Sequence, residues 1–205
     1  MSATAADLVP SPATLESLRE ASAGCRACPL WKKGTQTVFG EGRAGAPLMF
    51  VGEQPGDRED LAGRPFVGPA GRILDDALQQ VGIDRASTYV TNAVKHFKWE
   101  PRGQRRIHAK PSWSELSACR PWLEAELAVV RPRVLVCLGA TAAQSLLGRD
   151  FRVTKHRGEW LDSDLADHVT ATIHPSAILR QRDDESRHAE LEAFVNDLEL
   201  VARVL

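Results

Sequence analysis

The chain has 205 residues, of which 43% are hydrophobic and 26% are charged, as is usual for a globular protein and not for a disordered one. Its net charge of −1 excludes a uniformly basic protein that coats nucleic acid. No apolar run reaches the roughly 20 residues of a membrane span, and residues 1–12 lack the charged and apolar parts of a secretory signal. We therefore expect a monomeric, cytoplasmic protein without membrane contact, with one domain over residues 1–205 and a loose arm over residues 1–12.

Segments with helical periodicity alternate with short apolar runs along the chain. In chain order, the pattern predicts a helix over 14–23, a strand over 48–52, a helix over 70–81, a strand over 88–92, a helix over 114–130, a strand over 134–138, a helix over 141–147, a strand over 168–173 and a helix over 185–204. Ser114 is the predicted cap of the helix over 114–130, and Pro132 follows its end. This alternation predicts an α/β fold, a three-layer αβα sandwich with a central, mainly parallel four-stranded sheet.

The connection over residues 93–111 is long and strongly basic. Residues 95–110 contain six basic side chains and one acidic side chain, a net charge of +5 on a chain whose total is −1. His108 follows Arg105 and Arg106 within this segment. Long loops in compact domains are usually functional or mobile. A basic segment on an acidic body predicts a local site for a polyanion such as DNA.

The four cysteines of the chain leave two interpretations open: Cys25, Cys28, Cys119 and Cys137. They are either ordinary buried thiols, because a free cysteine behaves as a small hydrophobic residue, or one metal site. The Cys-x2-Cys pair does not open a helix after a strand, which argues against a thioredoxin-like dithiol. A helix followed at once by a strand can bring Cys119 close to Cys137, so the four thiols could bind zinc or an iron–sulfur cluster. Spacing alone does not choose the metal.

Polar side chains follow three of the predicted strands at their carboxyl ends. Glu53 and Gln54 follow the first strand, Asn92 ends the second and His174 follows the fourth. In open α/β sheets, ligands bind at this edge. Each residue alone has an ordinary explanation, such as a turn cap or a satisfied histidine, and Phe66 alone would be a core residue. Together, an acid, an amide, an imidazole and an aromatic ring are the groups that a flipped nucleobase requires.

Four motifs carry a resemblance to a known family: Gly52-Glu53-Gln54-Pro55-Gly56, Pro65-Phe66-Val67-Gly68-Pro69-Ala70-Gly71-Arg72, Thr91-Asn92-Ala93-Val94-Lys95-His96-Phe97-Lys98 and His174-Pro175-Ser176. They resemble the uracil-DNA glycosylase superfamily, and the four cysteines are similar to those of its iron–sulfur branch. Gln54 and Arg105-Arg106-Ile107-His108 are similar to the X-type subfamily, whose members bind uracil-DNA covalently. Gln104 stands where the loop of that subfamily usually has a lysine.

The resemblance implies a role for each of these side chains. Glu53 would stabilise the sugar cation, His174 would donate a hydrogen bond to the departing uracil, and His108 would capture the sugar in a covalent adduct. The resemblance assigns uracil binding to Gln54, Phe66 and Asn92. It assigns DNA binding to Lys95, Arg105, Arg106 and Ser176. A [4Fe–4S] cluster would be held by four thiolates: Cys25, Cys28, Cys119 and Cys137.

The implied function is base excision in DNA repair. The protein would flip uracil out of DNA, preferably single-stranded DNA, release free uracil and remain bonded to the sugar through His108. Two alternatives stay open. One is a conventional iron–sulfur uracil-DNA glycosylase, which turns over and releases a free abasic site. The other is a DNA-binding or redox iron–sulfur module without catalytic activity.

Overall fold

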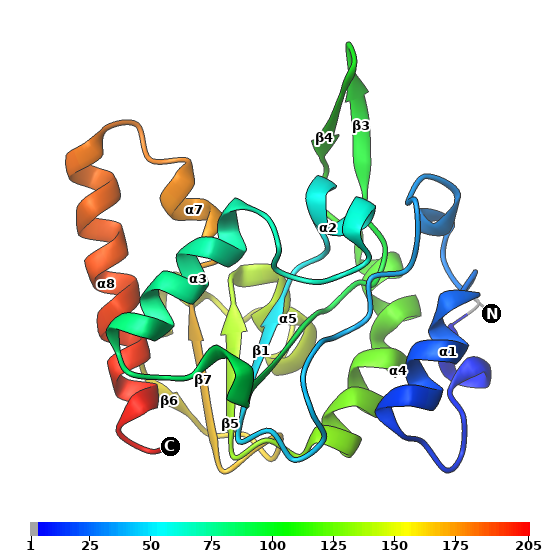
Figure 1. Ribbon diagram of the computed structural model, residues 1–205, viewed down its shortest axis with the longest axis horizontal. Coiled ribbons are helices and arrows are strands. Elements are labelled where there is room, and N and C mark those ends of the chain that lie inside the picture. The colour runs from blue at the N-terminus through cyan, green and yellow to red at the C-terminus, as the bar shows by residue number, and fades with distance from the viewer. Residues whose placement is uncertain (1–3) are drawn as a thin grey trace.

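The computed structural model describes residues 4–205, which form three layers around a central sheet (Figure 1). The sheet has five strands in the order β2-β1-β5-β7-β6. Four strands are parallel and one edge strand is antiparallel: β1 (Leu48–Gly52), β2 (Thr88–Asn92), β5 (Val134–Leu138) and β7 (His168–Thr172), with β6 (Trp160–Leu161) at the edge. The predicted α/β fold is confirmed. The sheet has one strand more than expected because β6, with two residues, is too short to give a periodic signal.

The register of the parallel strands brings the ends of β1, β2 and β7 to one edge. Gly52 pairs with Asn92, so the residue after Gly52 lies beside the end of β2. All five residues of β1 are buried, as its continuous apolar run predicts for a strand covered on both faces. This edge is where the polar residues that follow the strands collect.

Helices cover both faces of the sheet, and each face has its own hydrophobic core. On one face, α4 (Trp113–Val130) and α5 (Ala140–Leu147) pack on the sheet, and α1 (Leu15–Ala23) packs on α4. The other face is covered by α3 (Pro69–Gln80), α7 (Ser176–Leu179) and α8 (Asp184–Ala202) (Figure 1). Apart from α7, these helices were predicted to within two residues at each end, because their apolar residues repeat with the helical period.

The sequence pattern missed the short elements: α2 (Asp57–Ala62), α6 (Val153–His156), a hairpin of β3 (Trp99–Arg102) and β4 (Arg105–His108), and the 3-10 helices η1 (Ala5–Leu8), η2 (Pro29–Lys32) and η3 (Arg85–Ser87). The hairpin lies inside the predicted long connection and projects from the carboxyl edge of the sheet beside α2 (Figure 1). Its two-residue turn begins at Gly103, whose φ of +61° is in the left-handed region.

The N-terminal arm is packed against the protein over its described part. Residues 1–3 lie outside the described residues, but η1 follows directly and contacts α4. Ala5 within η1 is fully buried. No helix of residues 4–205 combines the length and the apolar character that a membrane span needs.

The longest internal helix, α4, begins with a capping box at Ser112 and not at the predicted Ser114. Ser112 Oγ accepts the N–H of Glu115 at 3.3 Å, and the Glu115 carboxylate accepts the N–H of Ser112 at 2.6 Å. The same carboxylate accepts a proton of Lys98 Nζ at 2.9 Å. Two serines two residues apart look alike in the sequence, and only the backbone geometry distinguishes them.

Replacing the observed cap should destabilise the fold, and replacing the predicted cap should not. Ser112→Ala removes the acceptor for the Glu115 N–H and should lower the free energy of unfolding by about 1 kcal/mol. In a domain of this size that corresponds to a fall in Tm of roughly 2–4 °C. Ser114→Ala is the matched control and should change Tm by less than about 1 °C. Thermal denaturation of both variants checks this, and equal losses would contradict the assignment of the cap.

Candidate active site at the carboxyl edge of the sheet

Glu53 is the centre of the site. It follows β1 and is largely buried, with its side chain 20% exposed. Its Oε1 lies 3.1 Å from His108 Nε2, and its Oε2 accepts a hydrogen bond from Thr141 Oγ1 at the start of α5. Burial opposes ionisation of Glu53, but the hydrogen bonds from His108 and Thr141 and the nearby imidazoles outweigh it and hold its pKa below the ordinary value. The site therefore contains a carboxylate at neutral pH.

His108 comes to this carboxylate from a segment 55 residues farther along the chain. It is the last residue of β4, its side chain is 50% exposed, and its ring lies beside that of Phe97 with 6.3 Å between centroids. The half-exposed imidazole thus faces a buried acid on one side and solvent on the other. A substrate arriving from solvent would meet it directly.

Gln54, which was predicted to bind uracil, instead fastens the hairpin that carries His108. Its Nε2 donates to the carbonyl oxygens of Lys98 and Ala109, both at 3.1 Å, and its Oε1 accepts the N–H of Lys98 at 3.0 Å. These two residues flank β3 and β4. The amide of Gln54 is therefore occupied within the protein, and its role is to hold both ends of the hairpin next to Glu53.

The two arginines of β4 have different environments. Arg106 forms ion pairs with Asp57 and Asp60, both at 2.6 Å, and its guanidinium lies over the Phe97 ring at 5.5 Å. Arg105 is exposed and has no carboxylate within 4 Å in the described part of the chain. Both arginines line the same surface hollow of about 430 Å³. The DNA contact of Arg105 stays a prediction, whereas the charge of Arg106 is already compensated by Asp57 and Asp60.

Phe66 and Asn92 meet above Gly52 at the end of β1. A Cβ atom at Gly52 would lie 2.8 Å from Phe66 Cζ and would also overlap Asn92 Oδ1, so only glycine lets both side chains approach. Phe66 itself has a φ of +56°. Its ring stacks on that of His174 with 6.0 Å between centroids and 25° between planes. The predicted aromatic ring, amide and imidazole are therefore adjacent.

His174 is held as one neutral tautomer. The N–H of Ser176 donates to His174 Nδ1 at 3.1 Å, which leaves the proton of the neutral ring on Nε2. Burial lowers the pKa of His174 to about 4, although Glu53 acts in the opposite direction. Ser176, which was predicted to contact DNA, uses its hydroxyl within the protein, 2.9 Å from Nδ1 and 2.8 Å from Arg180 Nη1. It orients the imidazole.

The prediction that Lys95 contacts DNA does not agree with its position. The side chain of Lys95 is 0% exposed. Its ammonium group donates to the Glu126 carboxylate, to Thr91 Oγ1 at 2.6 Å and to the carbonyl of Asn92 at 2.7 Å. A count of charges along the sequence does not show that a partner 31 residues away neutralises this lysine.

The structure groups three of the four cysteines. The pKa of Cys119 is raised to about 12, chiefly by burial and also by the nearby thiols of Cys28 and Cys25, against the effect of Lys95. Cys25 accepts the indole N–H of Trp122 at 3.3 Å, and Cys119 accepts the N–H of Lys95 at 3.2 Å. All four cysteines are buried and free.

Cys137 stands apart from this group. It lies within β5 between Val51 and Ala171 of the neighbouring strands. Its pKa is raised to about 12 by burial alone, without a contribution from another thiol. Over residues 4–205, no three histidine, cysteine or acidic side chains surround a point where a single metal ion would bind. The prediction that a helix–strand connection brings Cys137 to Cys119 does not agree with this geometry.

Two functional contacts were not predicted. Thr141 orients Glu53, and Asp60 anchors Arg106 while also accepting the N–H of Thr35 at 2.9 Å. The sequence contained a signal for Thr141, because this residue closely follows β5, and β5 is the parallel neighbour of β1. Asp60 had none, because it lies in a charged helix of six residues that reads as solvent-exposed.

Comparison with known proteins identifies the family of this chain. The family described as the uracil DNA glycosylase superfamily matches residues 39–199. The type-4 uracil-DNA glycosylase of Thermotoga maritima is 40% identical over 179 residues, which cover 87% of this chain and 90% of that protein. The type-4 enzyme of Sulfurisphaera tokodaii is 36% identical over 81% of this chain and 76% of its own, and the type-5 enzyme of Thermus thermophilus is 31% identical over 60% and 58%. The chain belongs to the uracil-DNA glycosylase superfamily.

Proposed function

We propose that this protein excises uracil from DNA by cleaving the bond between the base and the sugar. The observation that carries the proposal is the pair of titratable groups at the strand ends. Glu53 is held ionised and His174 is held neutral, on the same edge of the sheet. Both pKa values are lowered, which keeps the acid charged and the imidazole uncharged, and perturbed pKa values gathered in one site are typical of an active site. The names of the type-4 relatives support the same reaction.

The proposed reaction begins with a uracil that has left the base stack, which costs a few kcal/mol and less in single-stranded DNA. Phe66 stacks on the base, and the amide of Asn92 binds its Watson–Crick edge. As the bond between C1′ and N1 breaks, its electron pair leaves with the uracil. His174 Nε2–H donates to the oxygen that gains negative charge, and the Glu53 carboxylate stabilises the positive charge on the sugar.

The fate of the sugar cation distinguishes two candidate outcomes. Similarity to the type-4 enzymes supports capture by water and release of a free abasic site. One observation favours capture by the protein: His108 Nε2 lies 3.1 Å from Glu53 Oε1. In that case the Glu53 carboxylate takes the Nε2 proton, and the electron pair of the broken N–H bond forms the bond from Nε2 to C1′. The products are free uracil and a neutral imidazole bonded to the sugar, as the X-type resemblance implies.

Replacing His108 should convert capture into turnover. Wild-type protein mixed with a single-stranded uracil oligonucleotide should give a complex that survives a denaturing gel. His108→Ala should lose this complex and instead accumulate alkali-sensitive abasic sites, because Glu53, Asn92 and His174 remain in place. Glu53→Gln should slow both products on the order of 100-fold, since it acts before they diverge. His188→Ala, on the exposed face of α8, is the control. An adduct that persists in His108→Ala would exclude His108 as the nucleophile.

Single-stranded DNA is the proposed substrate, with Arg105 as its phosphate contact. Arg105→Ala should reduce the slope of log affinity against log salt by about 0.7, the value for one lost phosphate contact on a single strand. Arg106→Ala is the matched comparison and should leave the slope unchanged, because Asp57 and Asp60 already neutralise Arg106. It should weaken adduct formation by loosening the hairpin. Binding titrations from 50 to about 300 mM salt check this, and equal slopes for wild type and Arg105→Ala would place the DNA elsewhere.

We also propose a [4Fe–4S] cluster with Cys25, Cys28 and Cys119 as ligands. Three buried thiols near one another suit a soft metal centre, and coordination supplies the compensation that a buried thiolate needs. A cluster holds its thiolates on separate irons, so its ligands stand farther apart than those around one ion. Its part here is structural: it ties the segment after α1 to α4. The excision chemistry above requires no electron transfer.

The cluster assignment predicts a graded effect of cysteine substitutions. Protein purified without oxygen should be brown and contain about four irons per chain. Cys25→Ser, Cys28→Ser and Cys119→Ser should each lose most of the iron and the visible absorption. Cys137→Ser should keep both, because β5 holds Cys137 away from the other thiols. Colourless protein with one zinc per chain would contradict the cluster, and loss of iron in Cys137→Ser would restore Cys137 as a ligand.

A further inference from the structure

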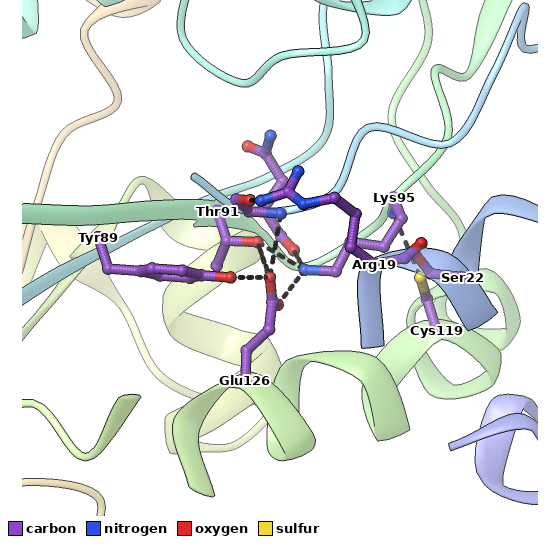
Figure 2. Close-up of polar contacts among 9 residues, drawn as sticks. Arg19, Ser22, Tyr89, Thr91, Lys95, Cys119 and Glu126 are labelled. Atoms are coloured by element: carbon purple, nitrogen blue, oxygen red, sulfur yellow. Dashed lines mark hydrogen bonds and ion pairs between the residues drawn. The ribbon is translucent and has the colours of Figure 1, made fainter. Parts of the chain in front are cut away.

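The buried pair of Lys95 and Glu126 is a charged group that the proposed reaction does not use. Both side chains are 0% exposed. The carboxylate of Glu126 points from α4 toward the ammonium group of Lys95 and the hydroxyl of Tyr89 (Figure 2). Besides Lys95, it accepts Tyr89 OH at 2.8 Å, Thr91 Oγ1 at 2.9 Å and the N–H of Gly40 at 3.1 Å. Burial together with Glu126 raises the pKa of Tyr89, so its hydroxyl remains a donor.

Stability alone does not require such a pair. Two charges lose their hydration when they are buried, and an apolar pair of similar volume is often as stable or more stable. A role in fixing the geometry of its neighbours would account for this buried pair where stability does not. The three donor contacts of the Lys95 ammonium indicate where that role lies, because one of them is the carbonyl of Asn92.

The segment from Asn92 to Lys95 connects three parts of the site. The N–H of Ala93 donates to Gly52 O at 2.9 Å, and the N–H of Val94 donates to Glu53 O at 3.0 Å. The N–H of Lys95 donates to Cys119 Sγ at 3.2 Å. The ammonium group of Lys95 then reaches back to the carbonyl of Asn92 at 2.7 Å and closes the turn. The backbone that carries Asn92 is thus tied to the acid, to a thiol and to the buried ion pair.

We infer that Lys95 is a positioning residue for uracil recognition: its ammonium group, neutralised by Glu126, fixes the carbonyl of Asn92 and thereby the direction of the Asn92 side chain. The inference rests on the proposed function, in which Asn92 reads the edge of the base. Lys95 itself touches neither DNA nor uracil. The backbone N–H of Lys95 also donates a hydrogen bond to Cys119 Sγ. The turn of residues 92–95 therefore couples the uracil pocket to the group of three cysteines.

Two variants separate positioning from a merely structural role. Glu126→Gln keeps the Lys95 ammonium and its bond to Asn92, but leaves a buried charge unpaired. The double variant Lys95→Met with Glu126→Gln removes both charges together with the bond to Asn92. The double variant should have the higher Tm of the two, because no unpaired charge is left inside. If Lys95 positions Asn92, the double variant should nevertheless have the poorer uracil selectivity.

Selectivity is measured as the ratio of affinities for two single-stranded oligonucleotides that differ at one position. One carries 2′-fluoro-2′-deoxyuridine, whose fluorine disfavours the sugar cation and so prevents excision during the measurement, and the other carries 2′-fluorothymidine. We expect the ratio to fall about tenfold in the double variant, the size of one misplaced hydrogen bond, and less than about threefold in Glu126→Gln. Adding Lys95→Met and Glu126→Gln to Asn92→Ala should have no further effect on the ratio.

Amide hydrogen exchange gives a second readout that does not depend on uracil. The amides of Ala93 and Val94 should exchange at least about tenfold faster in the double variant than in Glu126→Gln, while those of β5 stay protected. A wild-type protein without uracil preference would refute the proposed function, and the exchange rates would still test Lys95. Unchanged exchange at both amides would overturn the inference. So would a uracil selectivity that is better in the double variant than in Glu126→Gln, in the same order as their Tm values. Should the double variant not fold, Lys95→Leu with Glu126→Gln removes the same bond and takes its place.

Discussion

Gln54 binds the hairpin of β3 and β4 at both ends, and the position of His108 relative to Glu53 depends on this anchor. A two-stranded hairpin is only marginally stable by itself, so His108 has a fixed position only because side chains such as Gln54 and Arg106 fasten the hairpin to the rest of the protein. The side-chain amide of Gln54 makes three hydrogen bonds to Lys98 and Ala109, which flank the hairpin. Since Gln54 follows Glu53 directly, the turn that aims the acid also fixes the imidazole that faces it. Acid and imidazole are therefore positioned as one unit.

The distribution of charge within the basic segment follows from long-range pairing. Three of its six basic side chains have carboxylate partners in other elements: Lys95 with Glu126, Lys98 with Glu115, and Arg106 with Asp57 and Asp60. These side chains build the base of the hairpin and the turn beneath it. The positive surface left for a polyanion is correspondingly small and is centred on the exposed tip, where Arg105 lies. An encounter with DNA at this tip would bring the strand to His108 before it reaches the buried acid.

The parallel sheet makes the site possible, because the pairing of its strands is enough to place the ends of β1, β2 and β7 at one edge. This placement does not depend on contacts between the residues that follow the strands. Small local features then bring those residues together. Gly52 admits Phe66 and Asn92, Ser176 sets the tautomer of His174, and Thr141 orients Glu53. The site thus joins a rigid frame, which comes from the strands, to individual hydrogen bonds that decide which atom of each side chain is available for chemistry.

The sequence by itself determined the α/β class, four of the five strands, the long helices and most side chains at the strand ends, because these depend on periodicity and on short motifs. It also indicated Glu53, His108, Asn92, Phe66 and His174 as the reactive group. Only the tertiary structure decided which polar residues remain free. Lys95, Arg106 and Gln54 looked available along the chain, but each is occupied by partners between 3 and 55 residues away. The grouping of three thiols without Cys137 was likewise decided in space. Charge and spacing are local properties of a sequence, whereas burial and pairing depend on residues that meet only when the chain folds.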